Sequence, residues 1–121
     1  SMPATLDAAA LCKMADRGQI EGGVLDGPLA FDNAVSIAAA RIKGIESQVA
    51  GQADILVVPD LESGNMLAKQ LMYMGDAASA GIVLGAKVPV ILPSRAASRE
   101  SRTASCATAL MLAHRYRSVP P

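Results

Sequence analysis

The sequence predicts an α/β fold with a mixed, largely parallel sheet and helices on both faces. The run ILVV at 55–58 is unbroken and apolar, which is typical of a strand buried on both faces of a parallel sheet. Helical patterns separate this run from two further apolar runs at 81–85 and 88–92. Strands that alternate with helices favour a layered α/β arrangement, here in a single domain over 2–121.

The first half of the chain is predicted to form two helices with a short strand between them. Thr5 is a suitable N-cap for a helix that stops at Gly18. The apolar residues at 24–25 lie among glycines and are predicted to form a brief strand. Asp32 is expected to cap the second helix, whose apolar residues recur at helical spacing until Gly44.

The second half is predicted to add two more helices. Residues 63–65 are expected to open a helix that Gly75 terminates, and a final helix is predicted over about 98–116. The expected inward face of this final helix is formed by Ala104, Ala107, Leu110, Met111 and His114. On this interpretation His114 contributes to packing rather than to catalysis.

The composition leaves two explanations for a high apolar content. Of the 121 residues 51% are hydrophobic and 18% are charged, with a mean hydropathy of +0.31. Either some apolar surface contacts a partner, or the chain has a core rich in alanine.

Charge gives no argument for a nucleic-acid partner, because eleven basic residues balance eleven acidic ones. Five arginines nevertheless gather late in the chain, at Arg95, Arg99, Arg102, Arg115 and Arg117. They indicate either a local anion site or a solvated helix face.

The location expected from the sequence is the cytoplasm. Cys12 and Cys106 lack the spacing of a metal site, and they are typical of buried thiols in a reducing compartment. No apolar run reaches the roughly 18 residues needed to cross a bilayer, so no membrane partner is expected.

Three segments are expected to carry chemistry, since ligands of open α/β sheets bind where strands end and helices begin. They are DGPLAFDN, PDLESGN and PSRAAS. In the last of them the planar guanidinium of Arg95 can bind an anion through two hydrogen bonds, and the Ser94 hydroxyl can donate a hydrogen bond to a carbonyl oxygen. Neither glycine-rich nucleotide motif, GxxxxGK[ST] or GxGxxG, is present.

Four motifs together resemble one enzyme family. They are DGPLxxD at 26–32, VAGxADILVVPD at 49–60, GNM at 64–66 and SR at 94–95. In this order and spacing they are similar to the C-terminal part of the phosphate acetyl/butyryltransferases. The resemblance covers residues 6 to about 112, and the butyryl-like or bifunctional branch is expected to be more similar to this chain than the short acetyl branch.

The resemblance implies transfer of an acyl group between coenzyme A and inorganic phosphate. Coenzyme A is then a substrate, and neither a bound cofactor nor a metal is expected. The family has two α/β domains with the active site between them, and it associates as dimers. This chain is expected to be the C-terminal domain, with a fold like the second domain of isocitrate/isopropylmalate dehydrogenases and with the first domain absent.

The resemblance also assigns residue roles. Ser94 is implied as the donor to the acyl carbonyl and Arg95 as the anchor for phosphate and the oxyanion. Glu100 is the nearby carboxylate for the base, although its spacing differs from that of the family. The expected substrate-binding residues are Asp60, Gly64, Asn65, Gly85 and Lys87.

One other function is compatible with the sequence, and a second is disfavoured by it. A fragment of such an enzyme is expected to be inactive alone, and it could instead serve as a non-catalytic dimerisation module. A metal-dependent decarboxylating dehydrogenase would need clustered aspartates, and Asp54, Asp60 and Asp76 do not have that spacing.

Overall fold

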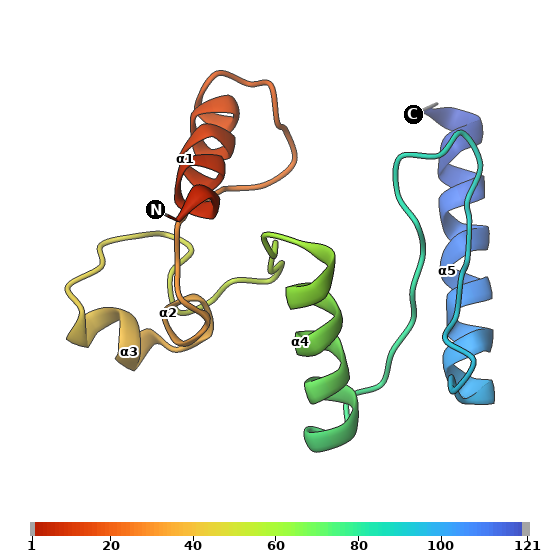
Figure 1. Ribbon diagram of the computed structural model, residues 1–121. Coiled ribbons are helices and arrows are strands. Elements are labelled where there is room, and N and C mark those ends of the chain that lie inside the picture. Colours follow the sequence, from red (N-terminus) through yellow and green to blue (C-terminus); the bar gives the residue numbers. More distant parts are fainter. Residues whose placement is uncertain (1, 120–121) are drawn as a thin grey trace. The chain divides into compact units, whose positions relative to one another are not determined.

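Helices are the main regular elements of residues 2–119, the part of the chain that the computed structural model describes (Figure 1). The helices are α1 (Pro3–Asp16), α2 (Phe31–Val35), α3 (Ile37–Ile42), α4 (Leu61–Met74) and α5 (Arg99–Ser118). Contacts divide the chain into two compact units, which we call unit 1 (Ser1–Leu61) and unit 2 (Glu62–Pro121). Residues 120 and 121 of the predicted domain lie outside the described residues.

The predicted mixed, largely parallel sheet is wrong for the described residues. Their only β pairing is an isolated antiparallel bridge, in which the Val83 N–H donates to the Val90 carbonyl at 2.8 Å. The run at 55–58 has no regular secondary structure and no strand partner among the described residues, and Ile55 and Val57 are 81% and 80% exposed. An apolar run indicates only that its side chains prefer burial. A strand also needs a second backbone in register for its hydrogen bonds, and the apolar pattern does not specify that partner.

Helix α1 begins earlier than the sequence predicts. Its N-cap is Met2 and Pro3 occupies the first turn, whereas the predicted cap, Thr5, donates its backbone N–H to the Met2 carbonyl at 3.0 Å. Proline suits this position because its fixed φ is helical and no partner is needed for its nitrogen. Gly18 follows the helix with a positive φ of 71°, so the predicted stop is confirmed.

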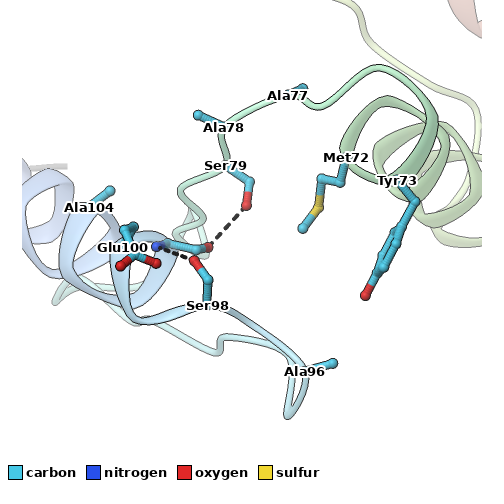
Figure 2. Close-up of a pocket in the computed structure, with 10 residues that line it drawn as sticks. Met72, Tyr73, Ala77, Ala78, Ser79, Ala96, Ser98, Glu100 and Ala104 are labelled. Carbon is cyan, nitrogen blue, oxygen red and sulfur yellow. Dashed lines mark hydrogen bonds between the residues drawn. The ribbon is translucent and has the colours of Figure 1, made fainter.

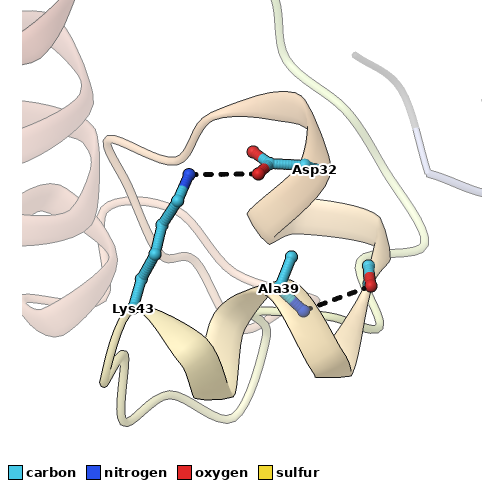
Figure 3. Close-up of polar contacts among 4 residues, drawn as sticks. Asp32, Ala39 and Lys43 are labelled. Atoms are coloured by element: carbon cyan, nitrogen blue, oxygen red, sulfur yellow. Dashed lines mark hydrogen bonds and ion pairs between the residues drawn. The ribbon is translucent and has the colours of Figure 1, made fainter.

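The single helix predicted from Asp32 is two helices. Ser36 interrupts it with an extended backbone (ψ 111°) and caps α3, because its hydroxyl accepts the Ala39 N–H at 3.3 Å (Figure 3). Asp32 lies in the first turn of α2 rather than at the cap, which is Ala30. A serine competes for backbone hydrogen bonds, and this explains why the pattern breaks here.

Asp32 forms an ion pair with Lys43 at 3.0 Å (Figure 3). The hydrogen bond from Lys43 is the largest reason why the pKa of Asp32 lies below its ordinary value of 3.8. Since the carboxylate form is the stabilised one, this contribution is present above pH 3.8 and is lost as the pH falls through the lower folded-state value. Both side chains are about half exposed, so the gain is small.

Small residues hold unit 1 together. The Gly51 N–H donates to the Asn33 carbonyl at 2.7 Å, and the Ala53 N–H donates to the Ala34 carbonyl at 3.0 Å. Ala34 is itself buried. Gly51 has a φ of +88°, and a Cβ there would lie 2.5 Å from the Cα of Ile37. Only glycine therefore allows the segment after residue 50 to lie against α2 and α3.

We expect Gly51→Ala to destabilise the chain by about 2–5 kcal/mol, since left-handed strain adds to a backbone overlap. The matched control is Gly22→Ala, because Gly22 has a φ of +89° and nothing lies within 4 Å of its Cβ position. Urea unfolding followed by circular dichroism measures both variants. Equal losses in the two variants would contradict the packing role of Gly51.

In unit 2, α5 buries a different face from the predicted one. Leu110 and Met111 are 72% and 74% exposed, while Ser105 is 2% exposed. The Ser105 hydroxyl accepts the Gly81 N–H at 3.0 Å and donates to the Ser101 carbonyl at 2.8 Å. The segment before the bridge therefore lies on the serine-bearing side of α5. The predicted start of this helix near residue 98 is confirmed, because Ser98 is the N-cap of α5 and its hydroxyl accepts the Ser101 N–H at 3.1 Å.

Candidate functional site

Ser94 and Arg95 lie in a tight turn directly before α5. The Ala97 N–H donates to the Ser94 carbonyl at 2.9 Å, and the Ala96 N–H donates to the Ser94 hydroxyl oxygen at 3.3 Å. Both Ser94 and Arg95 are exposed. Because the hydroxyl accepts a bond within the turn, its proton can still be donated to a ligand oxygen. The turn thus presents one hydroxyl donor and one permanent cation to solvent.

Glu100 lies in the first turn of α5, two residues after the cap. Its pKa is lowered below its ordinary value of 4.5, first by its own backbone N–H and then by the Ser98 hydroxyl. Both groups favour the carboxylate form, which also suits the positive end of a helix. An acid with a lowered pKa is a weaker proton acceptor, so the geometry gives little support to a role as general base.

A partly open pocket of about 310 Å³ adjoins this turn within unit 2 (Figure 2). It is lined by Met72, Tyr73, Ala77, Ala78, Ser79, Ala96, Ser98, Glu100, Ser101 and Ala104. The first two come from the end of α4 and the last four from the cap and first turns of α5. The hydroxyls of Ser79 and Ser101 lie 3.0 Å apart, so polar groups line one wall.

Sequence reasoning found only part of this pocket. Glu100 was a predicted site residue, whereas Tyr73 and Ser79 were not. The run of small residues at 77–81 is the signal that could have indicated a close approach to α5, since small side chains allow segments to pack closely.

Gly85 and Lys87 are not brought to Ser94. They lie in the loop between the bridged residues Val83 and Val90, at the end where the chain reverses. In Figure 1 this segment runs along α5 and then returns toward the start of that helix. Because the two arms are antiparallel, their carboxyl ends lie at opposite ends of the pairing, so Gly85 and Lys87 do not share an edge with Ser94 as the strand ends of a parallel sheet would.

The remaining predicted residues lie where α4 begins. The helix starts at Leu61 rather than at 63–65, so Gly64 and Asn65 are its fourth and fifth residues. Asp60 is exposed and belongs to unit 1, directly before the helix. Gly64 and Asn65 thus lie inside the helix rather than before its first turn.

Three features outside the pocket bear on the function of residues 2–119. Within that range no three His, Cys, Asp or Glu side chains come together in a group that could hold a metal ion. His114 is exposed, so its predicted packing role on the inward face is wrong. None of the helices in the same range has both the length and the apolar character needed to cross a membrane.

Residues 1–110 match the family model described as "Phosphate acetyl/butaryl transferase". The phosphate acetyltransferase of Rhizobium meliloti is 65% identical over 117 residues, which are 97% of this chain and 37% of the relative. The phosphate butyryltransferase of Clostridium acetobutylicum is 52% identical over 112 residues, which are 93% of this chain and 37% of that relative. Because this identity is lower than the 65% of the acetyltransferase, the expected greater similarity to the butyryl-like branch is wrong for these relatives. The chain therefore spans little more than a third of the length of these curated relatives.

A solved structure agrees with the sequence matches. The chain is similar to a branched-chain phosphotransacylase from Enterococcus faecalis V583, with a TM-score of 0.77 and 37% identity. This similarity covers 93% of the chain and 40% of the solved structure. The motifs and both kinds of comparison agree, and the chain belongs to the phosphate acetyl/butyryltransferase family.

Proposed function

We propose that this chain carries the phosphate-binding part of an enzyme that transfers an acyl group between coenzyme A and inorganic phosphate. The observation that carries the proposal is the exposed turn of Ser94 and Arg95 at the start of α5, in a chain of this family. A hydroxyl donor beside a guanidinium suits a reaction in which one oxygen gains negative charge next to a phosphate. Coenzyme A is a substrate in this proposal.

The proposed reaction is an acyl substitution. The coenzyme A thiolate attacks the carbonyl carbon of an acyl phosphate, and the carbon–sulfur bond forms while the carbonyl oxygen becomes an oxyanion. The oxyanion then collapses, the bond from carbon to the phosphate oxygen breaks, and phosphate leaves with the electron pair. Ser94 donates its hydroxyl proton in a hydrogen bond to the oxyanion, and Arg95 neutralises the departing phosphate.

Glu100 has the least support of the three predicted catalytic residues. A base for this reaction must take a proton from a thiol, whose ordinary pKa is about 8.5. The lowered pKa of Glu100 widens that gap. In the proposal Glu100 therefore stabilises the start of α5 through its contact with Ser98. Asp60, Gly64 and Asn65 remain candidates for substrate contacts.

The test is an acyl-transfer assay in a chimera. This chain replaces the 117 matching residues of the Rhizobium meliloti phosphate acetyltransferase, which are 65% identical to it. The assay follows thioester formation from acetyl phosphate or butyryl phosphate and coenzyme A. An inactive but folded chimera would overturn the proposal.

A second candidate function is a non-catalytic assembly module. Exposed apolar side chains favour it, among them Ile55 and Val57 in a segment that pairs with no strand in residues 2–119. An unpaired apolar edge is a template for pairing with another chain.

We also place the protein in the cytoplasm, which the free thiols of Cys12 and Cys106 support.

We expect the chain to self-associate at micromolar concentration through residues 55–58. Ile55→Lys combined with Val57→Lys should shift the mass in light scattering toward the monomer, because lysine on an edge opposes pairing. The control is Leu6→Lys, since Leu6 is also largely exposed but lies on α1. A strictly monomeric wild-type mass would contradict the prediction.

A further inference from the structure

We propose that Arg102 is a positioning residue that holds the turn at 94–97 in the shape that presents Ser94 and Arg95. Its Nη2 donates to the Arg95 carbonyl at 3.2 Å, and its Nε donates to the Ala97 carbonyl at 3.3 Å. One guanidinium therefore bridges two carbonyls on either side of Ala96. The catalytic meaning of this contact rests on the proposed function, whereas the contact itself does not.

The base of the Arg102 side chain is itself well anchored. Its backbone N–H donates to the Ser98 carbonyl at 3.1 Å, in the first turn of α5. Ser98 in turn caps the helix through the Ser101 N–H. The Arg102 side chain thus links the turn to the helix that carries its backbone, so the turn and the start of α5 form one hydrogen-bonded unit.

The turn needs such an anchor, because its internal bonds are few. The Ala97 N–H and the Ala96 N–H both go to Ser94, and Ser94 and Arg95 are exposed. Fixing the carbonyls of Arg95 and Ala97 fixes the peptide planes on which the Arg95 side chain depends. Displacing a reacting group by about 1 Å can cost on the order of 10² in rate.

The positive charge of Arg102, rather than its hydrogen bonds to two carbonyls, could also order the turn. Substitutions that keep or remove the charge distinguish these two explanations. A planar guanidinium donates to two carbonyls in a fixed fork, whereas a lysine ammonium is a single flexible point charge. Arg102→Lys keeps the charge and loses the fork. Arg102→Met loses both but keeps an apolar stem. If Arg102 acts as a fork, both variants should behave alike.

The first measurement is amide hydrogen exchange by NMR on the chain itself. We expect protection of the Ala97 amide to fall about two- to tenfold in Arg102→Lys and in Arg102→Met, which is the effect of losing about one net hydrogen bond. Arg99→Met is the matched control, because Arg99 lies on the same first turn of α5. Unchanged protection in both Arg102 variants overturns the proposal, and so does a loss in the methionine variant alone.

A titration with inorganic phosphate separates this proposal from the proposed function. Phosphate should shift the Arg95 side-chain signals in the wild type, and less in both Arg102 variants. A different outcome is that phosphate leaves the Arg95 side-chain signals of the wild type unchanged while the Ala97 protection still falls in the Arg102 variants. That result would refute the anion role of Arg95 and support the hydrogen bonding of Arg102 to the turn. If phosphate shifts wild type and Arg102 variants equally, Arg102 does not position the site.

In the chimera, both Arg102 variants should lower kcat by about 10- to 100-fold without a change in the thermal midpoint. Arg99→Met should leave kcat within about twofold, because it keeps every turn contact. A parallel fall in thermal stability and activity would reduce Arg102 to a structural residue and overturn the positioning role.

Discussion

The chain by itself is expected to show no measurable acyl transfer between acetyl phosphate and coenzyme A, whereas the chimera is expected to turn over. The chain covers 37% of the length of the Rhizobium meliloti relative, and its pocket, which Ala96 of the turn lines, is partly open to solvent. Orienting two substrates supplies much of the rate of such a reaction, and an open surface holds neither of them in a reactive geometry.

The measurement is thioester formation with both proteins at equal concentration. The unreplaced relative serves as the positive control, and circular dichroism shows that the isolated chain is folded. Turnover by the chain alone at a rate near that of the relative, lost in Arg95→Gln, would show that the chain is a complete catalyst and would refute this expectation.

Arg95→Gln in the chimera is expected to lower kcat by about 10²–10³, the usual effect of removing one preorganised charge-stabilising group. Ser94→Ala should have an effect of similar size if its hydroxyl donates to the oxyanion. The exposed turn predicts that neither change unfolds the protein, since both residues face solvent.

Arg99→Gln is the matched control for Arg95→Gln. Both are exposed arginines near the start of α5, but only Arg95 lies in the turn that precedes it. The KM for phosphate, measured in the reverse direction, should rise in Arg95→Gln and stay constant in the control. Equal kinetic effects of the two substitutions would mean that only the general positive charge matters.

Several features could be predicted from the sequence because they depend on local chemistry. Ser98 was predicted to start the last helix, since a serine hydroxyl satisfies a free backbone N–H wherever the helix packs. Gly18 ends α1 for a similar reason. Family membership also followed from the motifs alone, because their order and spacing are independent of the tertiary structure.

Features that depend on distant partners could not be predicted. Residues 55–58 have the composition of a buried strand, yet no partner backbone pairs with them in the described residues. The inward face of α5 was predicted from apolar residues, whereas Ser105 is buried because the Gly81 N–H needs its hydroxyl. Hydropathy reports the preference of a side chain, but the hydrogen-bond partner available in space decides the outcome.

The candidate site shows the same division. The sequence by itself determined that Ser94 and Arg95 are adjacent before a helix and that they match the family motif. Only the tertiary structure decided that Gly85 and Lys87 lie at the opposite end of an antiparallel pairing, and that Arg102 reaches back to two carbonyls of the turn. Chain direction and side-chain reach are properties of three-dimensional packing, so no pattern of residue types specifies them.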